Sequence, residues 1–208
     1  SARAARGCLL GAFLNPGQVC TAGIRIFVHE RVAATLKERI SALMPRLRIG
    51  DPCEDGTQMG TLGSRQHFER VQYYVDLAKR EGGHLVCGGE TVSVAKYPKG
   101  LFMSPHLFEG VDPLGRVANE EIFGPVATMW EWTDDSAMLA QVNAVSQGLA
   151  AGIWTRDITR AHAATQAVQT GRAWVNCYNL FPSGASFAGS KASGFGREDA
   201  CETLLDST

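Results

Sequence analysis

The feature that most constrains the fold is an alternation of apolar runs and amphipathic stretches along most of the chain. Apolar runs at 24–28 and 126–132 predict buried strands. A helix is predicted after the first run, because apolar residues recur every three or four positions: Val32, Leu36, Ile40, Leu43 and Leu47. Strands separated by helices are typical of right-handed crossovers in a parallel sheet. We therefore expect a three-layer α/β fold, with a mostly parallel sheet and helices on both faces.

Other elements follow from local signals. A helix is predicted from Ser64, an N-cap residue type, with its apolar face inward: Phe68, Val71, Tyr74, Val75 and Ala78. Turn residues dominate 88–111, where we predict short strands, for example at 101–103, and 112–119 is predicted to be loop. The remaining predictions are helices at 2–14, 134–145 and 157–171, strands at 85–87, 149–155 and 173–176, and an aromatic-bearing loop from 177 onward.

Length and composition describe an ordinary globular protein. The 208 residues fit one domain, 1–208, with ample length for a core. A net charge of -1, with 45% hydrophobic and 20% charged residues, gives no electrostatic reason to bind nucleic acid or an anionic membrane. The longest uncharged stretch, 137–154, is too polar to span a bilayer, and we expect no secretory leader. A cytoplasmic protein is expected.

Cysteine and histidine spacing predicts no metal site. The six cysteines form no Cys-x-x-Cys pair, and the five histidines show no metal-ligand spacing. Most of the cysteines are expected to be reduced thiols that fill the core.

Cys20 differs from the other cysteines because of its neighbours. The helix from Ala2 must end at Asn15-Pro16-Gly17, since Pro16 disfavours helical geometry at Asn15 and Gly17 permits a positive φ. Cys20 then falls on a turn just before the strand at 24–28. A thiol on such a turn can be held rigidly and still be reached, and its own backbone N–H could stabilise an oxyanion. The residues alone leave a buried structural thiol as the alternative.

Four segments resemble signatures of one enzyme family. Asn15-x-Gly17-Gln18-x-Cys20 resembles the catalytic-cysteine signature of the aldehyde dehydrogenase superfamily. The other three, in the family's order, are Glu120–Val126, which looks like its Glu-x-Phe-Gly-Pro cofactor segment, Trp174–Asn176 and Lys191–Glu198. The resemblance implies oxidation of a small aldehyde to a carboxylic acid with NAD or NADP, through a thiohemiacetal and then a thioester on Cys20.

The resemblance also assigns roles to cofactor-site residues. It implies that Glu121 accepts hydrogen bonds from the nicotinamide ribose hydroxyls, and that Phe123 lies near the nicotinamide. An ionised carboxylate suits vicinal hydroxyls because it can accept from both at once. His67 and Arg70 occupy positions where the family has further ribose contacts. From the residues alone, Glu121 would be a solvated surface carboxylate.

Catalytic support and substrate contacts are implied in the same way. Asn15 supports the catalytic loop in the family, a role compatible with capping the preceding helix. Phe181 and Phe187 match positions that line the family's substrate tunnel, and a loop that exposes two aromatic side chains suits a pocket. Three residues that flank the nucleophile are expected in the substrate site as well: Leu14, Val19 and Thr21.

The resemblance covers only the C-terminal catalytic part of the family. It implies that the dinucleotide-binding domain, the general-base glutamate and a tail strand lie outside these residues, and that the full-length enzyme is a homo-oligomer. The chain alone is therefore expected to be inactive as a dehydrogenase. Two alternatives stay open: a cysteine-dependent esterase activity of the isolated domain, and a non-catalytic assembly module.

Overall fold

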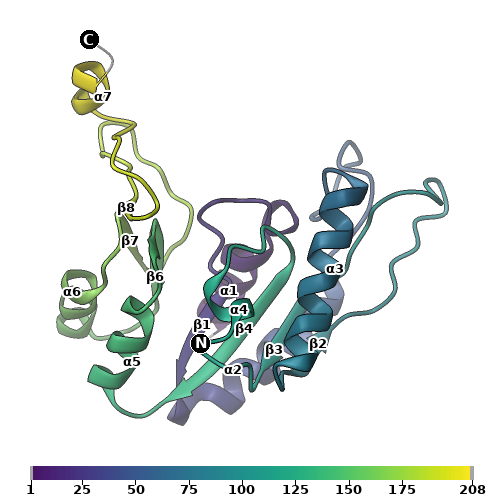
Figure 1. Ribbon diagram of the computed structural model, residues 1–208, viewed down its shortest axis with the longest axis horizontal. Coiled ribbons are helices and arrows are strands. Elements are labelled where there is room, and N and C mark those ends of the chain that lie inside the picture. Colours follow the sequence, from purple (N-terminus) through teal and green to yellow (C-terminus); the bar gives the residue numbers. More distant parts are fainter. Residues whose placement is uncertain (1, 207–208) are drawn as a thin grey trace. The chain divides into compact units, whose positions relative to one another are not determined.

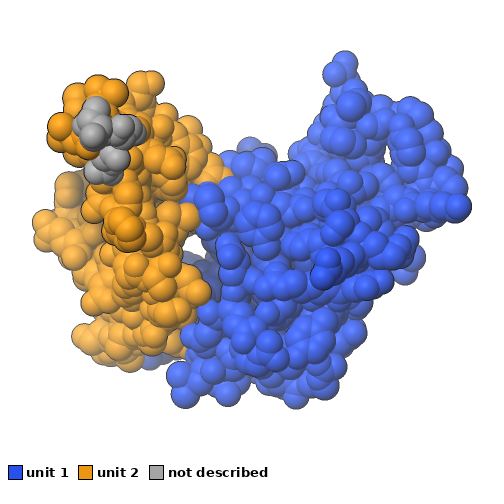
Figure 2. Space-filling view, turned by 45° about the horizontal axis from the view of Figure 1, so that its top comes forward, with its two compact units in different colours: residues 1–133 blue, residues 134–208 orange. Residues whose placement is uncertain are grey.

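The computed structural model describes residues 2–206. It divides into two compact units, residues 1–133 and 134–208, which Figure 2 distinguishes by colour. The first unit contains a four-stranded sheet (Figure 1), and its strands in spatial order are β1 (Arg25–His29), β4 (Val126–Trp132), β3 (His106–Glu109) and β2 (His84–Gly88). Strands β1 and β3 both run parallel to β4, whereas β2 is antiparallel to β3. Two of the three pairings are therefore parallel.

Helices cover both faces of this sheet. They are α1 (Ala2–Phe13) and α2 (Glu30–Leu43) on one face, and α3 (Arg65–Arg80) and α4 (Arg116–Asn119) on the other. The alternation along β4 explains the division, because side chains of neighbouring strand residues point to opposite faces. Ala127 and Met129 join the core beneath α1 and α2, whereas Val126 joins the core beneath α3. The predicted three-layer α/β architecture is confirmed in this unit.

One local signal for the helices is confirmed and one is corrected. Ser64 caps α3, since its hydroxyl accepts a hydrogen bond from the His67 N–H at 3.1 Å. The α2 helix ends at Leu43 instead of continuing to Leu47, and a short 3₁₀ turn, η2 (Met44–Arg46), follows it. Pro45 explains this, because its missing N–H cannot continue the helix.

The buried stripe of α2 also differs from the prediction. Val32 is 52% exposed, and the residues that face the core are Ala33, Leu36 and Ile40. These three follow a helical repeat of three and four positions.

Two predictions between the second and fourth strands were wrong. No strand forms at 101–103; Phe102 and Met103 are buried in extended chain without ladder pairing, and the strand in this region is β3. The predicted loop at 112–119 contains the single-turn helix α4. Its N-terminus is held by Glu81 from the end of α3, which accepts from the Arg116 N–H at 3.0 Å.

The second unit continues the strand and helix alternation. Asp134 caps α5 (Asp135–Asn143) and Asp157 caps α6 (Ile158–Ala167), at the predicted starts of the two helices. Strands β6 (Ala150–Ile153) and β7 (Arg172–Val175) pair in parallel, and α6 packs against both. A minor antiparallel pair joins β5 (Gln147–Gly148) to β8 (Ser190–Lys191), and α7 (Cys201–Asp206) was not predicted. No helix within residues 2–206 is long and apolar enough to cross a membrane.

Candidate active site

Cys20 lies on a tight turn between α1 and β1. A 3₁₀ turn, η1 (Asn15–Gly17), follows α1, and Gly17 has the positive φ, +70°, that the sequence predicts. The Ala22 N–H then donates to the Val19 carbonyl at 2.9 Å, which puts Cys20 at the corner of a turn. We call residues 14–22 the cysteine loop. The thiol is exposed, so the alternative of a buried structural thiol is excluded.

Both polar groups of Cys20 are available for chemistry. Among residues 2–206, neither its thiol nor its backbone N–H has a hydrogen-bond partner. An N–H free beside a nucleophile can stabilise negative charge that develops next to the sulfur. Two other thiols are less exposed than that of Cys20. Burial raises the pKa of Cys8 to about 11 and also raises the pKa of Cys87.

A second segment, residues 120–125, packs directly against the cysteine loop; we call it the Glu121 loop. A Cβ atom on Gly17 would lie 2.6 Å from the carbonyl carbon of Gly124 and 3.1 Å from the nitrogen of Pro125. Only glycine leaves room for this approach. Gly124 in turn packs on the side chain of Val71 in α3. The cysteine of the first loop and the carboxylate of the second are thus carried by backbones in contact.

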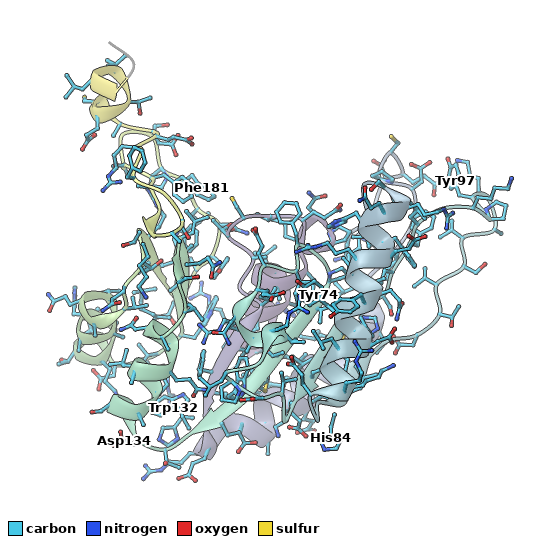
Figure 3. All side chains as sticks on the ribbon, in the orientation of Figure 1. Tyr74, His84, Tyr97, Trp132, Asp134 and Phe181 are labelled. Atoms are coloured by element: carbon cyan, nitrogen blue, oxygen red, sulfur yellow. The ribbon has the colours of Figure 1, made fainter. Side chains whose placement is uncertain are left out.

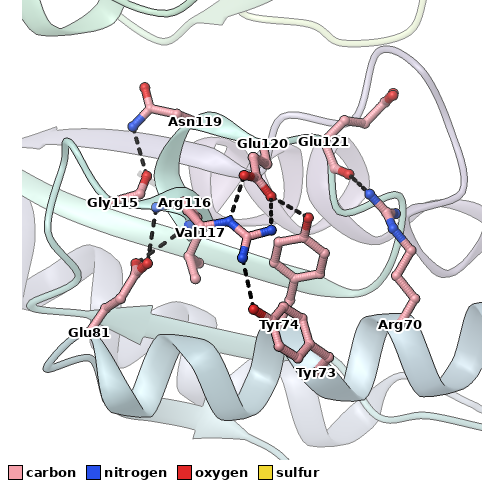
Figure 4. Close-up of polar contacts among 10 residues, drawn as sticks. All are labelled: Arg70, Tyr73, Tyr74, Glu81, Gly115, Arg116, Val117, Asn119, Glu120 and Glu121. Carbon is pink, nitrogen blue, oxygen red and sulfur yellow. Dashed lines mark hydrogen bonds and ion pairs between the residues drawn. The ribbon is translucent and has the colours of Figure 1, made fainter.

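The Glu121 loop is held by side chains of α3. Arg70 donates to the Glu121 carbonyl at 2.7 Å and to the Ile122 carbonyl at 2.8 Å, and His67 Nε2 donates to the Phe123 carbonyl at 2.7 Å. Figure 4 shows the Glu121 carboxylate pointing away from α3, and it has no partner among the described residues. His67 and Arg70, expected at the ribose, are thus engaged with the main chain.

The neighbouring carboxylate, Glu120, is fully engaged. Arg116 Nε and Nη2 donate to it at 2.7 and 2.9 Å, and the Tyr74 hydroxyl donates at 2.6 Å (Figure 4). Arg116, followed by Tyr74, lowers the pKa of Glu120 to about 2. Tyr74 reaches it from the inner face of α3 (Figure 3). The two adjacent glutamates therefore differ: Glu120 anchors the loop, and the Glu121 carboxylate has no partner among the described residues.

Two amide side chains organise the cysteine loop. Asn15 Nδ2 donates to the Gln18 carbonyl at 3.1 Å and so closes the loop on itself. Gln18 reaches out of it: Nε2 donates to the Thr61 carbonyl at 3.1 Å, and Oε1 accepts from the Gly63 N–H at 2.9 Å. Sequence reasoning included Gln18 in the motif but gave it no role, because partners more than forty positions away leave no local signal.

The expected substrate residues of the cysteine loop divide by exposure. Leu14 is 40% exposed and Val19 is half-buried, so both remain accessible beside the thiol. Thr21 is only 4% exposed. Its side chain therefore lies in the interior, next to the exposed thiol.

Phe181 and Phe187 contact each other in the second unit. Their rings meet edge to face at 5.2 Å, and the Arg172 guanidinium lies 5.7 and 5.6 Å from their centroids. Arg172 also donates to the Ala185 and Ser186 carbonyls, which fixes the loop that carries both rings. Phe187 lines a groove of about 340 Å³ in this unit. The predicted aromatic loop is thus ordered around a β7 side chain.

The whole chain, residues 1–208, matches the model of the aldehyde dehydrogenase family. The chain belongs to this family. Among curated relatives, the betaine aldehyde dehydrogenase of Brucella anthropi is 40% identical over 198 residues, a match that covers 95% of this chain and 41% of that protein. A similar protein of Brucella ovis is 39% identical over the same length. The chain therefore spans about two fifths of the length of these aldehyde dehydrogenases.

Solved structures of aldehyde dehydrogenases share the fold. The NAD+ complex of the Bacillus cereus enzyme superposes with a TM-score of 0.91 at 35% identity, and covers 97% of this chain and 40% of that one. Betaine aldehyde dehydrogenase of Staphylococcus aureus, also in complex with NAD+, gives 0.93 at 29% identity, with 98% and 40% covered. The family's α/β fold is therefore shown for this chain.

Proposed function

We propose that this protein oxidises a small aldehyde to a carboxylic acid with NAD+ or NADP+, and that residues 1–208 form the cysteine-bearing catalytic domain. One observation carries the proposal: the exposed thiol of Cys20 lies on a fixed turn whose backbone contacts the loop that presents the free carboxylate of Glu121. Family membership makes the chemistry specific, because a reactive thiol beside a carboxylate is by itself compatible with several reactions.

Cys20 carries the substrate through two covalent states. Its sulfur, as thiolate, attacks the aldehyde carbon to form a thiohemiacetal, and the carbonyl electron pair moves onto oxygen. The backbone N–H of Cys20 donates to that oxyanion. Loss of hydride from the same carbon restores the carbonyl and leaves a thioester on Cys20. Water then attacks the thioester, and the acid departs as the thiolate is regenerated.

The Glu121 loop fits the nicotinamide half of the cofactor. The free carboxylate of Glu121 can accept hydrogen bonds from two vicinal hydroxyls, and Phe123, 37% exposed, offers a flat face to a ring. When bound, the nicotinamide supplies the hydride acceptor. We assign His67 and Arg70 to holding this loop in place, since both side chains bind its carbonyls. The NAD+ bound by the Bacillus cereus and Staphylococcus aureus proteins supports this choice.

We propose substrate contacts on the cysteine loop of the first unit and, separately, on the aromatic loop of the second unit. Leu14 and Val19 flank the nucleophile and leave apolar surface exposed. Phe181 and Phe187 supply aromatic surface that is already ordered by Arg172. Asn15 supports the loop instead of contacting substrate, because its amide is used within it.

Acyl capture tests the nucleophile directly. The chain is incubated with p-nitrophenyl acetate, and peptide mass spectrometry locates the acetyl group. We expect acetylation of Cys20 at least about tenfold faster than of Cys53, an exposed thiol without the cysteine-loop signature. Cys20→Ser should abolish the fast acetylation, and Cys53→Ser should preserve it. Equal labelling of the two cysteines would count against the proposal.

Dehydrogenase activity provides the second test. Aldehyde-dependent reduction of NAD+ or NADP+ by the protein that carries these residues should fall by about a thousandfold or more in Cys20→Ser, because the nucleophile is removed. Cys53→Ser is the matched control and should keep its activity. Undiminished activity in Cys20→Ser would overturn the assignment.

A cysteine-dependent esterase is the second candidate. The free thiol and free N–H of Cys20 require no cofactor, so hydrolysis of an activated ester needs nothing beyond the cysteine loop and water. Continuous release of p-nitrophenol after one equivalent per Cys20 would support this activity. A single burst would instead show that the acyl group stays on the sulfur. The other alternative is a non-catalytic assembly module, in which Cys20 would have no special reactivity. Alkylation of Cys20 no faster than that of an exposed model thiol would favour this alternative.

A further inference from the structure

The cysteine loop is tied to the beginning of α3 by one side chain. Gln18 binds the carbonyl of Thr61 through Nε2 and the N–H of Gly63 through Oε1, at 3.1 and 2.9 Å. Ser64, the next residue after Gly63, is the N-cap of α3. The amide of Gln18 therefore satisfies one acceptor and one donor immediately before the helix begins.

The segment that Gln18 binds is itself fixed. Leu62, between the two partners, is 2% exposed and belongs to the core beneath α3. Its N–H donates to the Leu101 carbonyl at 3.0 Å, and the Ser64 hydroxyl accepts from His67. A side chain anchored to this segment is anchored to the helix, because cap and core hold the two together.

The same helix holds the Glu121 loop one turn further on. Arg70 and His67 bind its carbonyls, and Gly124 packs on Val71. The contact between Gly17 and Gly124 then joins the two loops to each other. Three segments thus close a circuit, which we call the α3 frame: the cysteine loop, the first two turns of α3 with residues 61–63, and the Glu121 loop.

We propose that Gln18 is a positioning residue, whose amide sets the place of Cys20 relative to the Glu121 loop through the α3 frame. The proposal rests on the roles assigned above to Cys20 and Glu121. It predicts that the thiol responds to changes at α3 that do not touch the cysteine loop. A Gln18 that only stabilised its own loop would produce no such response.

The experiment measures the rate of alkylation of Cys20 by iodoacetamide, quantified on the peptide that contains it. Gln18→Met preserves the length of the side chain and removes the hydrogen bonds to Thr61 and Gly63, together with a longer one to the Asn15 carbonyl at 3.4 Å. Arg70→Met removes the contacts to the Glu121 loop from the far side of the frame. Arg65→Met is the matched control, because Arg65 lies on the same helix, is exposed and binds neither loop. Circular dichroism melting confirms that each variant is folded, and Arg70→Lys replaces Arg70→Met if the latter does not fold.

We expect Gln18→Met and Arg70→Met each to change the Cys20 rate by about threefold or more in the same direction, as coupled neighbouring sites do. The double variant should show no more than the larger single effect. Arg65→Met should leave the rate unchanged. A rate within about 1.5-fold of the original in the Arg70 variant, or independent effects that multiply in the double variant, would overturn the proposal.

Alkylation and acyl capture separate this proposal from the proposed function. Iodoacetamide needs only an accessible thiol, so coupling between Gln18 and Arg70 can be present even if Cys20 forms no acyl intermediate. Conversely, acyl capture on Cys20 with no coupling would support the enzyme and refute the positioning role of Gln18.

Discussion

Gly17 and Gly124 meet backbone to backbone, with no room for a side chain on Gly17. The two residues are separated by more than a hundred positions, yet a Cβ on Gly17 would lie 2.6 Å from the carbonyl carbon of Gly124. One belongs to the loop that carries the thiol and the other to the loop that carries the free carboxylate. The distance between the two loops is therefore set by main-chain atoms, which are displaced less easily than flexible side chains.

Gly17→Ala is expected to destabilise the protein by about 2–4 kcal/mol, because a positive φ and an overpacked contact add together. Gly82→Ala is the matched control: the φ of Gly82 is +85°, and the Gly110 carbonyl oxygen would lie 3.8 Å from the new Cβ, an ordinary contact distance. Gly82→Ala should cost about 1–2 kcal/mol, from strain alone. Urea unfolding measures the free energy of unfolding of both variants. Equal losses of stability would show that the backbone around Gly124 can move to make room for the new methyl group.

The anchoring of Glu120 predicts a loss of stability in acid. Its pKa is lowered from 4.5 to about 2 in the folded protein, first by Arg116 and then by Tyr74. The stabilisation is therefore present above pH 4.5 and is lost as the pH falls from 4.5 toward 2. Glu120→Gln should be less stable at neutral pH and should lose less stability across this window. Unfolding free energies measured at several pH values test this. Parallel curves for the two proteins would contradict it.

Ile40 and Val32 provide a test of the corrected face of α2. Ile40 is 1% exposed and Val32 is 52% exposed. Ile40→Ala should cost about 2–5 kcal/mol through the cavity it leaves, whereas Val32→Ala should stay within about 0.5 kcal/mol. Denaturant unfolding measures both. A large loss of stability in Val32→Ala would instead support the prediction from the sequence that Val32 faces the core.

Burial predicts that Cys8 resists alkylation. Its pKa is raised to about 11, so little thiolate is present at neutral pH. Iodoacetamide should modify Cys8 about a hundredfold more slowly than the exposed Cys53, because thiolate is the reactive form. Peptide mass spectrometry measures both rates, and the difference should vanish in urea. Similar rates in the folded protein would place Cys8 outside the core.

The sequence predicted those parts of the fold that local signals encode. Ser64 was identified as an N-cap, and the helices predicted from 134 and 157 begin there; all three side chains accept a backbone hydrogen bond from the first turn. The position of β3 was not predicted, because three of its four residues are buried and show no alternation. The single-turn helix α4 was missed because its N-terminus is held by Glu81, thirty-five positions earlier in the chain.

The candidate site divides in the same way. The turn at Cys20 could be derived, because Pro16 and Gly17 dictate it locally. The engagement of Arg70 with the Glu121 loop could not, since the partners are separated by about fifty positions. Only the pair Arg116 and Glu120, four positions apart, had a helical spacing that could have been noticed.

Residues 61–63 bind the cysteine loop and the first two turns of α3 bind the Glu121 loop, so a change in chain length has different effects at different places in the sequence. Residues gained or lost in the stretch from 89 to 100, outside every helix and strand, would leave thiol and carboxylate at the same separation. One residue inserted between Gly63 and Arg70 would instead rotate Arg70 by about 100° around the helix axis. Its hydrogen bonds to the Glu121 and Ile122 carbonyls would then be lost. Natural insertions and deletions should therefore be tolerated between residues 89 and 100 and be absent between residues 63 and 70.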